Sequence, residues 1–250
     1  MTAAARELVY SQLGSLDSES LAVSMRARHD AFPMLEVPYF LSPLLVTSMA
    51  AELDEIPLRN CKHFIRRGSN MYEHNDLDAT PQAQAVVNVL HGHRFLAWLE
   101  AVSGVQGLIP DPHLTGAGYV KSFAGDSLQI HSDFNWCDQL KLHRAVSLII
   151  YLNRDWDPSW GGALNFYAED RTSVINSVLP GSGNLFIWRY HPLALHGYPS
   201  PMTCPSTHSR KALRLFYYTS NAVPSEQDPP HRSLYWTDNE GYPCDDRSQR

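Results

Sequence analysis

The stretch SLQIHSD, residues 127–133, carries more information about this protein than any other part of its sequence. Its start predicts a β-strand, Ser127–His131, that runs directly into His131-Ser132-Asp133. On an extended backbone, residues i and i+2 point to the same face, so the imidazole of His131 and the carboxylate of Asp133 converge. These are two of the three ligands of a 2-His-1-carboxylate facial triad, which suits Fe(II) because it leaves positions on the metal open. Taken alone, His131 and Asp133 are interpreted as a hydrogen-bonded pair at the surface, and only further ligands elsewhere in the sequence would make them an iron site.

Further short strands are predicted on both sides of this stretch, from about residue 116 onward. Gly, Pro, Asp and Asn separate them, as they do in sandwiches, jelly rolls and barrels. The additional predicted strands are Gly118–Phe123, Ala145–Leu152, Ala163–Tyr167, Ser173–Val178, Asn184–Trp188 and Ala212–Thr219.

The first hundred residues have helical spacing instead. Ser42-Pro43 and Thr80-Pro81 each combine a capping hydroxyl with a proline, which is favoured at the first helical position. A further amphipathic helix is predicted from His93 to Val105. Residues 59–79 are polar and are expected to be irregular. The sequence thus predicts a mainly β protein with α-helices, in which an N-terminal helical layer supports one β-domain.

Composition narrows the classes of partner. The 250 residues are 44% hydrophobic with a net charge of −6, and no run of Lys and Arg exceeds two, so no nucleic-acid partner is expected. The first ten residues lack the pattern of a signal peptide, and no apolar run reaches the length of a membrane span. The expected location is cytoplasmic, without a membrane partner. Free thiols rather than disulfides or a zinc site are expected at four widely separated cysteines, Cys61, Cys137, Cys204 and Cys244.

The third metal ligand must come from elsewhere in the fold. His196, 63 residues after Asp133, lies in a predicted loop after the strand Asn184–Trp188 and is the favoured candidate. His191 is the rival, but it precedes a proline close to that strand and is expected in the turn. His208 is interpreted as a loop residue.

An anion clamp would complete the site. Arg210, 14 residues after His196, stands at the start of an apolar strand, where its guanidinium can hold a carboxylate with two parallel hydrogen bonds. Tyr151 can add a hydroxyl to the same carboxylate.

These residues belong to a series of motifs that resembles the prolyl-4-hydroxylase-like 2-oxoglutarate/Fe(II) oxygenases. The resemblance runs from about Gly118 to Thr219, and it depends on the order and spacing of the whole series. The motifs are His131-Ser132-Asp133, Tyr151-Leu152-Asn153-Arg154-Asp155-Trp156, Trp160-Gly161-Gly162-Ala163-Leu164, Leu185-Phe186-Ile187-Trp188, His196-Gly197-Tyr198-Pro199 and Arg210-Lys211-Ala212-Leu213.

The resemblance implies a double-stranded β-helix, a jelly-roll and cupin-like core, whose mouth holds Fe(II) on His131, Asp133 and His196. It implies that Arg210 and Tyr151 bind the far carboxylate of 2-oxoglutarate while the keto-acid end chelates the metal. Such enzymes use O₂ to convert 2-oxoglutarate to succinate and CO₂ and hydroxylate an unactivated C–H bond, with ascorbate as a candidate reductant.

Two positions bear on how closely this chain follows the family. Where the family often has a tyrosine before the H-x-D strand, this chain has Phe123, so that hydroxyl is missing unless Tyr119 replaces it. Asp133 is retained, which argues against the halogenating variants, in which a small residue makes room for chloride.

Substrate contacts are expected from three places. The polar segment 66–75 is a candidate lid, with Arg67, Tyr72 and Glu73 as its contact residues. Asn135 and Trp136 follow Asp133 and are expected at the mouth. Arg214 shares a strand face with Arg210 and needs an anionic partner, either a substrate carboxylate or a nearby acid.

The favoured function is hydroxylation of a small amino-acid-like or amino-acid-derived metabolite that carries a carboxylate. The alternatives are a hydroxylase that acts on a prolyl or other side chain of a protein or peptide, and a non-catalytic cupin-like metal-binding sensor. We expect one domain over residues 1–250, with helical support and a lid in about 1–110, the β-helix core in about 111–221 and a tail in 222–250.

Overall fold

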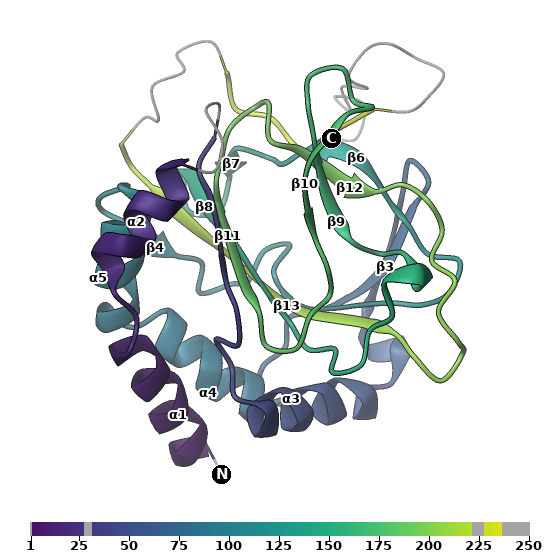
Figure 1. The fold of residues 1–250 in the computed structure, drawn as a ribbon, viewed down its shortest axis with the longest axis horizontal. Helices are drawn as coiled ribbons and strands as arrows, with labels where there is room; N and C mark the ends of the chain where they lie inside the picture. Colours follow the sequence, from purple (N-terminus) through teal and green to yellow (C-terminus); the bar gives the residue numbers. More distant parts are fainter. Residues whose placement is uncertain (1, 28–31, 222–227, 237–250) are drawn as a thin grey trace.

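Two antiparallel β-sheets face each other, and helices cover the outer face of the larger sheet (Figure 1). The computed structural model describes residues 2–27, 32–221 and 228–236, and the statements below concern these residues. The helices are α1 (Thr2–Gly14), α2 (Ser18–Ala27), α3 (Pro43–Glu55), α4 (Pro81–Leu90) and α5 (His93–Ser103), with 3₁₀ turns at Leu58–Asn60 and Pro158–Trp160.

Most of the strand pairs in the two sheets join strands that are distant in sequence. In the larger sheet the order is β1 (Met34–Val37), β11 (Leu185–Arg189), β8 (Leu142–Tyr151), β13 (Arg210–Thr219), β5 (Gly118–Ser122), β3 (Ser69–His74) and β2 (Lys62–Arg66), with β4 (Ile109–Pro110) on β13 and β7 (Trp136–Cys137) on β8. In the smaller sheet the order is β10 (Val174–Val178), β9 (Leu164–Tyr167), β12 (Leu195–Tyr198), β6 (Leu128–Ser132) and β14 (Leu234–Tyr235).

The apolar strand β8 is buried on both faces, and its alternation creates two cores. Leu148 and Ile150 pack toward the helices, whereas Ile149 and Tyr151 pack toward the smaller sheet. One apolar cluster therefore joins the helices to the large sheet, and the other fills the space between the two sheets. This arrangement confirms the predicted β-domain with helical support.

The two predicted helix starts are correct, but only one is capped locally. The hydroxyl of Ser42 accepts a hydrogen bond from the Leu45 amide at 3.4 Å, whereas Thr80 makes no side-chain cap. The carboxylate of Glu52 in α3 instead accepts the first free amides of α4, from Gln82 at 2.8 Å and Ala83 at 3.0 Å. A tertiary contact thus satisfies donors that a helix start leaves free.

The expectation of an irregular segment at residues 59–79 is wrong. Strands β2 and β3 form a hairpin that is joined by Arg67 and Gly68, both at positive φ (50° and 84°), as a two-residue hairpin turn requires. Strand β3 also pairs with β5 along the edge of the large sheet. The polar composition concealed these strands because one face of the hairpin borders a cavity rather than an apolar core.

The remaining expectations concern membranes, thiols and the tail. None of the helices in the described ranges combines the length and apolarity that crossing a bilayer requires. Cys61, Cys137 and Cys204 are free thiols, as expected, while Cys244 lies outside the described residues. Of the tail, residues 228–236 are described and lie against β6, whereas 222–227 and 237–250 lie outside the described residues.

Candidate metal centre and active site

Two neighbouring strands of the smaller sheet bring the predicted metal ligands together. His131 on β6 lies directly opposite His196 on β12, and Asp133 follows the end of β6. The Asp133 carboxylate oxygens lie 3.7 Å from His131 Nε2 and 3.8 Å from His196 Nε2. Each of the three side chains offers a ligand atom within 4.8 Å of the others, and all three are buried. His196, expected at a loop end, lies instead within β12.

Backbone carbonyls set the orientation of both imidazoles. The Nδ1 atom of His131 lies 2.9 Å from the Gln129 carbonyl, and that of His196 lies 2.8 Å from the Ala194 carbonyl. Because a carbonyl only accepts, each Nδ1 carries the hydrogen and each Nε2 presents its lone pair to the centre. Burial, and then the neighbouring His196, lower the pKa of His131 to about 3, and burial also lowers the pKa of His196. Two neutral imidazoles and a carboxylate fit a divalent iron ion.

Asp133 also has a buried partner that sequence reasoning missed. Arg144, at the start of β8, is 1% exposed and donates from Nη2 to Asp133 Oδ2 at 2.9 Å. Its Nε and Nη2 atoms also donate to the Ser147 hydroxyl, at 3.0 and 2.8 Å. Burial acts to raise the pKa of Asp133, but Arg144 and the two histidines hold it below its usual value. The only local signal was a single charge directly before the apolar segment Ala145–Leu152.

Of the predicted clamp, Arg210 lines the same small cavity as the metal ligands, whereas Tyr151 is buried behind it and does not line that cavity. Arg210, 3% exposed, lines an inner cavity of about 40 Å³ together with His131, Asp133 and His196. Its Nη2 donates to the Tyr151 hydroxyl at 2.9 Å, which leaves the hydrogen of that hydroxyl as a donor for an anion.

Tyr198 is the phenol that lines the inner cavity. Its ring lies under the Arg210 guanidinium, 4.5 Å from the ring centroid, and its hydroxyl lies 3.1 Å from that of Ser122. Tyr119 does not replace the hydroxyl missing at Phe123, because its side chain points to the helical layer, where it donates to Glu52 at 2.8 Å.

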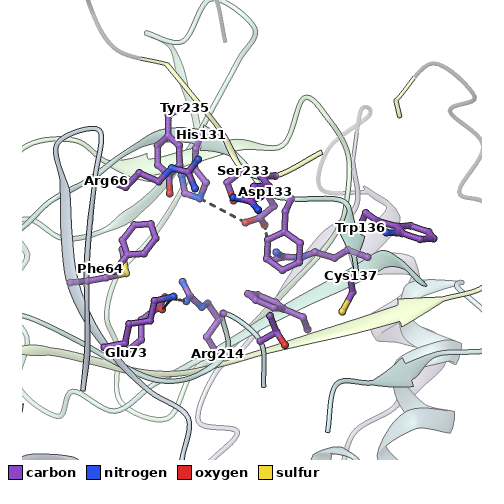
Figure 2. Close-up of a pocket in the computed structure, with 18 of the residues that line it drawn as sticks. Phe64, Arg66, Glu73, His131, Asp133, Trp136, Cys137, Arg214, Ser233 and Tyr235 are labelled. Carbon is purple, nitrogen blue, oxygen red and sulfur yellow. Dashed lines mark hydrogen bonds and ion pairs between the residues drawn. The ribbon is translucent and has the colours of Figure 1, made fainter. Parts of the chain in front are cut away.

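A larger cavity of about 450 Å³ opens beside the same ligands (Figure 2). Three of the residues expected to contact substrate, Glu73, Trp136 and Arg214, line it. Arg214 donates from Nη2 to Glu73 Oε1 at 2.5 Å, so the nearby acid that its position required is Glu73. Figure 2 shows both side chains on the side of the cavity opposite His131 and Tyr235.

The other three expected substrate residues do not line this cavity. Arg67 lies in the hairpin turn, and Tyr72 points to the opposite face of β3 from Glu73, where it stacks on His63 with a centroid distance of 4.3 Å. Asn135 is used structurally, because its side chain donates to the Asp228 and Pro229 carbonyls and accepts from the His231 amide.

Residues 228–236 complete the cavity wall, which sequence reasoning did not anticipate. Strand β14 pairs with β6, so that Tyr235 lies opposite His131. The Tyr235 ring stacks on the His131 imidazole with a centroid distance of 5.0 Å and an interplanar angle of 17°. This contact covers one face of a candidate metal ligand and limits how far its ring can turn.

Comparisons with known proteins find similarity to one family of oxygenases. Residues 117–218 match the model of the 2OG-Fe(II) oxygenase superfamily. The mouse (Mus musculus) prolyl 3-hydroxylase OGFOD1 is 30% identical over 106 residues, a match that covers 41% of this chain and only 18% of that protein.

Solved structures resemble the fold over most of the chain. A Pseudomonas putida prolyl-4-hydroxylase is 16% identical, with a TM-score of 0.56 over 82% of this chain and 100% of its own. A Trichoplax adhaerens prolyl hydroxylase, in complex with a hypoxia inducible factor peptide fragment, is 16% identical, with a TM-score of 0.59 over 84% and 94%. HygX from Streptomyces hygroscopicus, with nickel and 2-oxoglutarate bound, is 15% identical, with a TM-score of 0.54 over 82% and 88%. The strands that carry the triad thus lie in a region similar to the 2OG-Fe(II) oxygenase superfamily, and the solved structures share the fold of the chain.

Proposed function

We propose that this chain is a dioxygenase that hydroxylates an unactivated C–H bond of an amino-acid-like substrate, using Fe(II), O₂ and 2-oxoglutarate. The observation that carries this proposal is the inner cavity, which places Arg210 and the three candidate ligands around one space. A metal-binding sensor has no need of a carboxylate clamp beside its metal, so this arrangement favours turnover.

Each residue of the site has a distinct task in this proposal. His131, Asp133 and His196 hold the iron, and Arg210 with Tyr151 fixes the distal carboxylate of 2-oxoglutarate. When bound, the iron and cosubstrate supply the oxidising chemistry, which releases succinate and CO₂. Apolar side chains exclude water from the inner cavity, and these are Met71, Val120, Leu128, Ile149, Leu164 and Trp188.

The outer cavity is where the substrate would meet the metal. Its volume lies in the range of roughly 300–1,000 Å³ that is usual for small-molecule sites. A free amino acid fits such a space. A prolyl or other side chain of a peptide is the second candidate, because three of the four similar proteins named above are prolyl hydroxylases and one of these holds a peptide.

Uncoupled decarboxylation of 2-oxoglutarate tests the proposed activity without a known substrate. We expect the Fe(II)-loaded protein to form succinate slowly in air, and aliphatic amino acids or proline-containing peptides of the correct class to accelerate it. Succinate is measured by mass spectrometry, with iron content determined on the same sample. Absence of succinate from protein that holds stoichiometric iron would reject the dioxygenase activity and leave the metal-sensor alternative.

The turn at Gly161-Gly162 provides a test of how the clamp is positioned. Both glycines have positive φ, 76° and 73°. A Cβ at Gly162 would lie 2.5 Å from Met202 Sδ and 3.3 Å from Arg210 Cδ, whereas a Cβ at Gly161 would have nothing within 4 Å. The Arg210 Nε also donates to the Gly162 carbonyl at 2.8 Å.

Gly162→Ala is therefore expected to displace Arg210 and to raise the KM for 2-oxoglutarate by about tenfold, since overpacking costs about 1–3 kcal/mol. Gly161→Ala is the matched control, because it introduces the same side chain at a similar positive φ without the clash, and its KM should equal that of wild type. The two KM values are compared in the uncoupled assay. Equal KM values for the two variants would contradict the role of this contact.

A further inference from the structure

Two arginine side chains that line the outer cavity have N–H groups without acceptors. Arg144 Nη1 and Arg214 Nε are buried and have no hydrogen-bond partner among the residues that the structure describes. Both groups lie beside the ring of Phe216, with Cζ 3.5 Å and 5.5 Å from the ring centroid. Because a buried cationic donor without an acceptor is unfavourable, the site is incomplete as the protein alone provides it.

The position of these groups separates them from the 2-oxoglutarate clamp. Arg144 and Arg214 line both the inner and the outer cavity, together with His131 and Asp133. Arg210 lines only the inner one. The Arg144 and Arg214 side chains therefore lie where the two cavities meet, next to the candidate ligands of the metal.

The charges around these cavities favour an anion there even when iron and cosubstrate are bound. The three arginines that line the inner cavity, Arg144, Arg210 and Arg214, are opposed by two carboxylates, those of Asp133 and Glu73. A divalent iron and the dianion 2-oxoglutarate cancel each other, so the loaded site keeps one positive charge. Lys62, Arg66 and Arg232 line the outer part of the same cavity and add positive potential, whereas Asp138 there is 87% exposed and pairs with Lys141. A single residual charge in a weakly solvated cavity is matched by one carboxylate.

We propose that Arg144 and Arg214 form a subsite for a carboxylate of the substrate itself, distinct from the Arg210 clamp for 2-oxoglutarate. This inference rests on the proposed hydroxylase function and narrows its substrate class. The carboxylate belongs either to a free amino acid or to the C-terminal residue of a peptide. A residue inside a peptide chain lacks it. Glu73 holds Arg214 toward the cavity, and Phe64, Met71 and Leu128 provide an apolar wall for the hydrocarbon part of the substrate.

The test compares matched probes that differ only in this carboxylate. The probes are L-proline, L-leucine and L-isoleucine, their carboxamides, tripeptides that end in the same residues with free or amidated C-termini, and doubly capped peptides with these residues inside. Binding is measured by calorimetry on the Fe(II)- and 2-oxoglutarate-loaded protein without oxygen, so that the result does not depend on turnover. We expect free carboxylates to bind at least about tenfold more tightly than their amides. The free amino acids and the tripeptides show which source the subsite accepts.

Variants then assign the effect to the subsite. Arg214→Gln is expected to weaken carboxylate binding by about tenfold or more, and Arg214→Lys by less, because lysine keeps the charge but not the planar fork. Lys141→Gln removes the same charge from an exposed side chain near the cavity and should bind the probes as wild type does.

Three results would overturn the subsite: probes that bind no better than their amides, an equal loss in Lys141→Gln, or an Arg214→Gln variant whose 2-oxoglutarate affinity falls as much as its probe affinity. If the wild-type protein forms no succinate in the uncoupled assay, the proposed function is rejected. The binding data still test the subsite in that case, because they do not depend on turnover.

Discussion

Asp133→Ala is expected to abolish turnover and also to destabilise the protein before any metal is added. The substitution removes a metal ligand and leaves Arg144 buried, 1% exposed, without its carboxylate partner. Breaking a buried ion pair from one side costs about 3–5 kcal/mol, because the remaining charge is uncompensated. Urea unfolding of the metal-free proteins measures the free energy of unfolding, and anaerobic titration of Fe(II) with 2-oxoglutarate measures the weak visible band of the chelate.

Two companion variants separate the structural loss from the catalytic one. Asp133→Asn keeps an oxygen that can accept from Arg144, so it should unfold at a higher urea concentration than Asp133→Ala and still be inactive. Asp133→Ala combined with Arg144→Met removes both charges and should recover much of the stability without activity. Activity in any of these proteins would show that Asp133 is not a metal ligand. Wild-type stability of Asp133→Ala would show that the pair with Arg144 contributes nothing.

Arg210→Ala is expected to raise the KM for 2-oxoglutarate by about 10- to 100-fold. Hydrogen bonds to charged groups contribute about 1.5–3 kcal/mol, and about 1.4 kcal/mol corresponds to a factor of ten. The guanidinium is already oriented by the Gly162 carbonyl at 2.8 Å and the Tyr151 hydroxyl at 2.9 Å, so little ordering is required when the cosubstrate binds.

Arg210→Lys and Tyr151→Phe divide this effect into its parts. Lysine keeps the charge but loses the two-pronged geometry, so its KM should lie between those of wild type and the alanine variant. Tyr151→Phe removes one hydroxyl and should raise the KM less than Arg210→Ala does. The KM values come from succinate formation at varied 2-oxoglutarate concentration. An unaltered KM in Arg210→Ala would remove this residue from the cosubstrate site.

Local sequence patterns determined the strands of the core, the helix starts and two of the three candidate metal ligands. Alternation and turn residues predicted seven strands that the structure contains with shifted ends, among them β6, β8 and β13. The pair His131 and Asp133 converges because of backbone geometry over three residues, which any extended strand provides. At the start of α3, the Ser42 hydroxyl accepts a hydrogen bond from the amide of Leu45, three residues later. In each case the interaction that forms the structure lies within a few residues of the pattern that predicts it.

Tertiary structure decided the features that depend on partners distant in sequence. His196 reaches the metal site because the register of β12 on β6 places it opposite His131. Arg144 reaches the site because the start of β8 lies close enough for its guanidinium to bind Asp133. The polar hairpin β2–β3 becomes a cavity wall only through its pairing with β5. Tyr235 covers His131 because a segment more than one hundred residues later adds a strand to β6. Strand pairing and buried charge pairing gain their free energy from partners that no local pattern contains, and for that reason only the folded chain shows them.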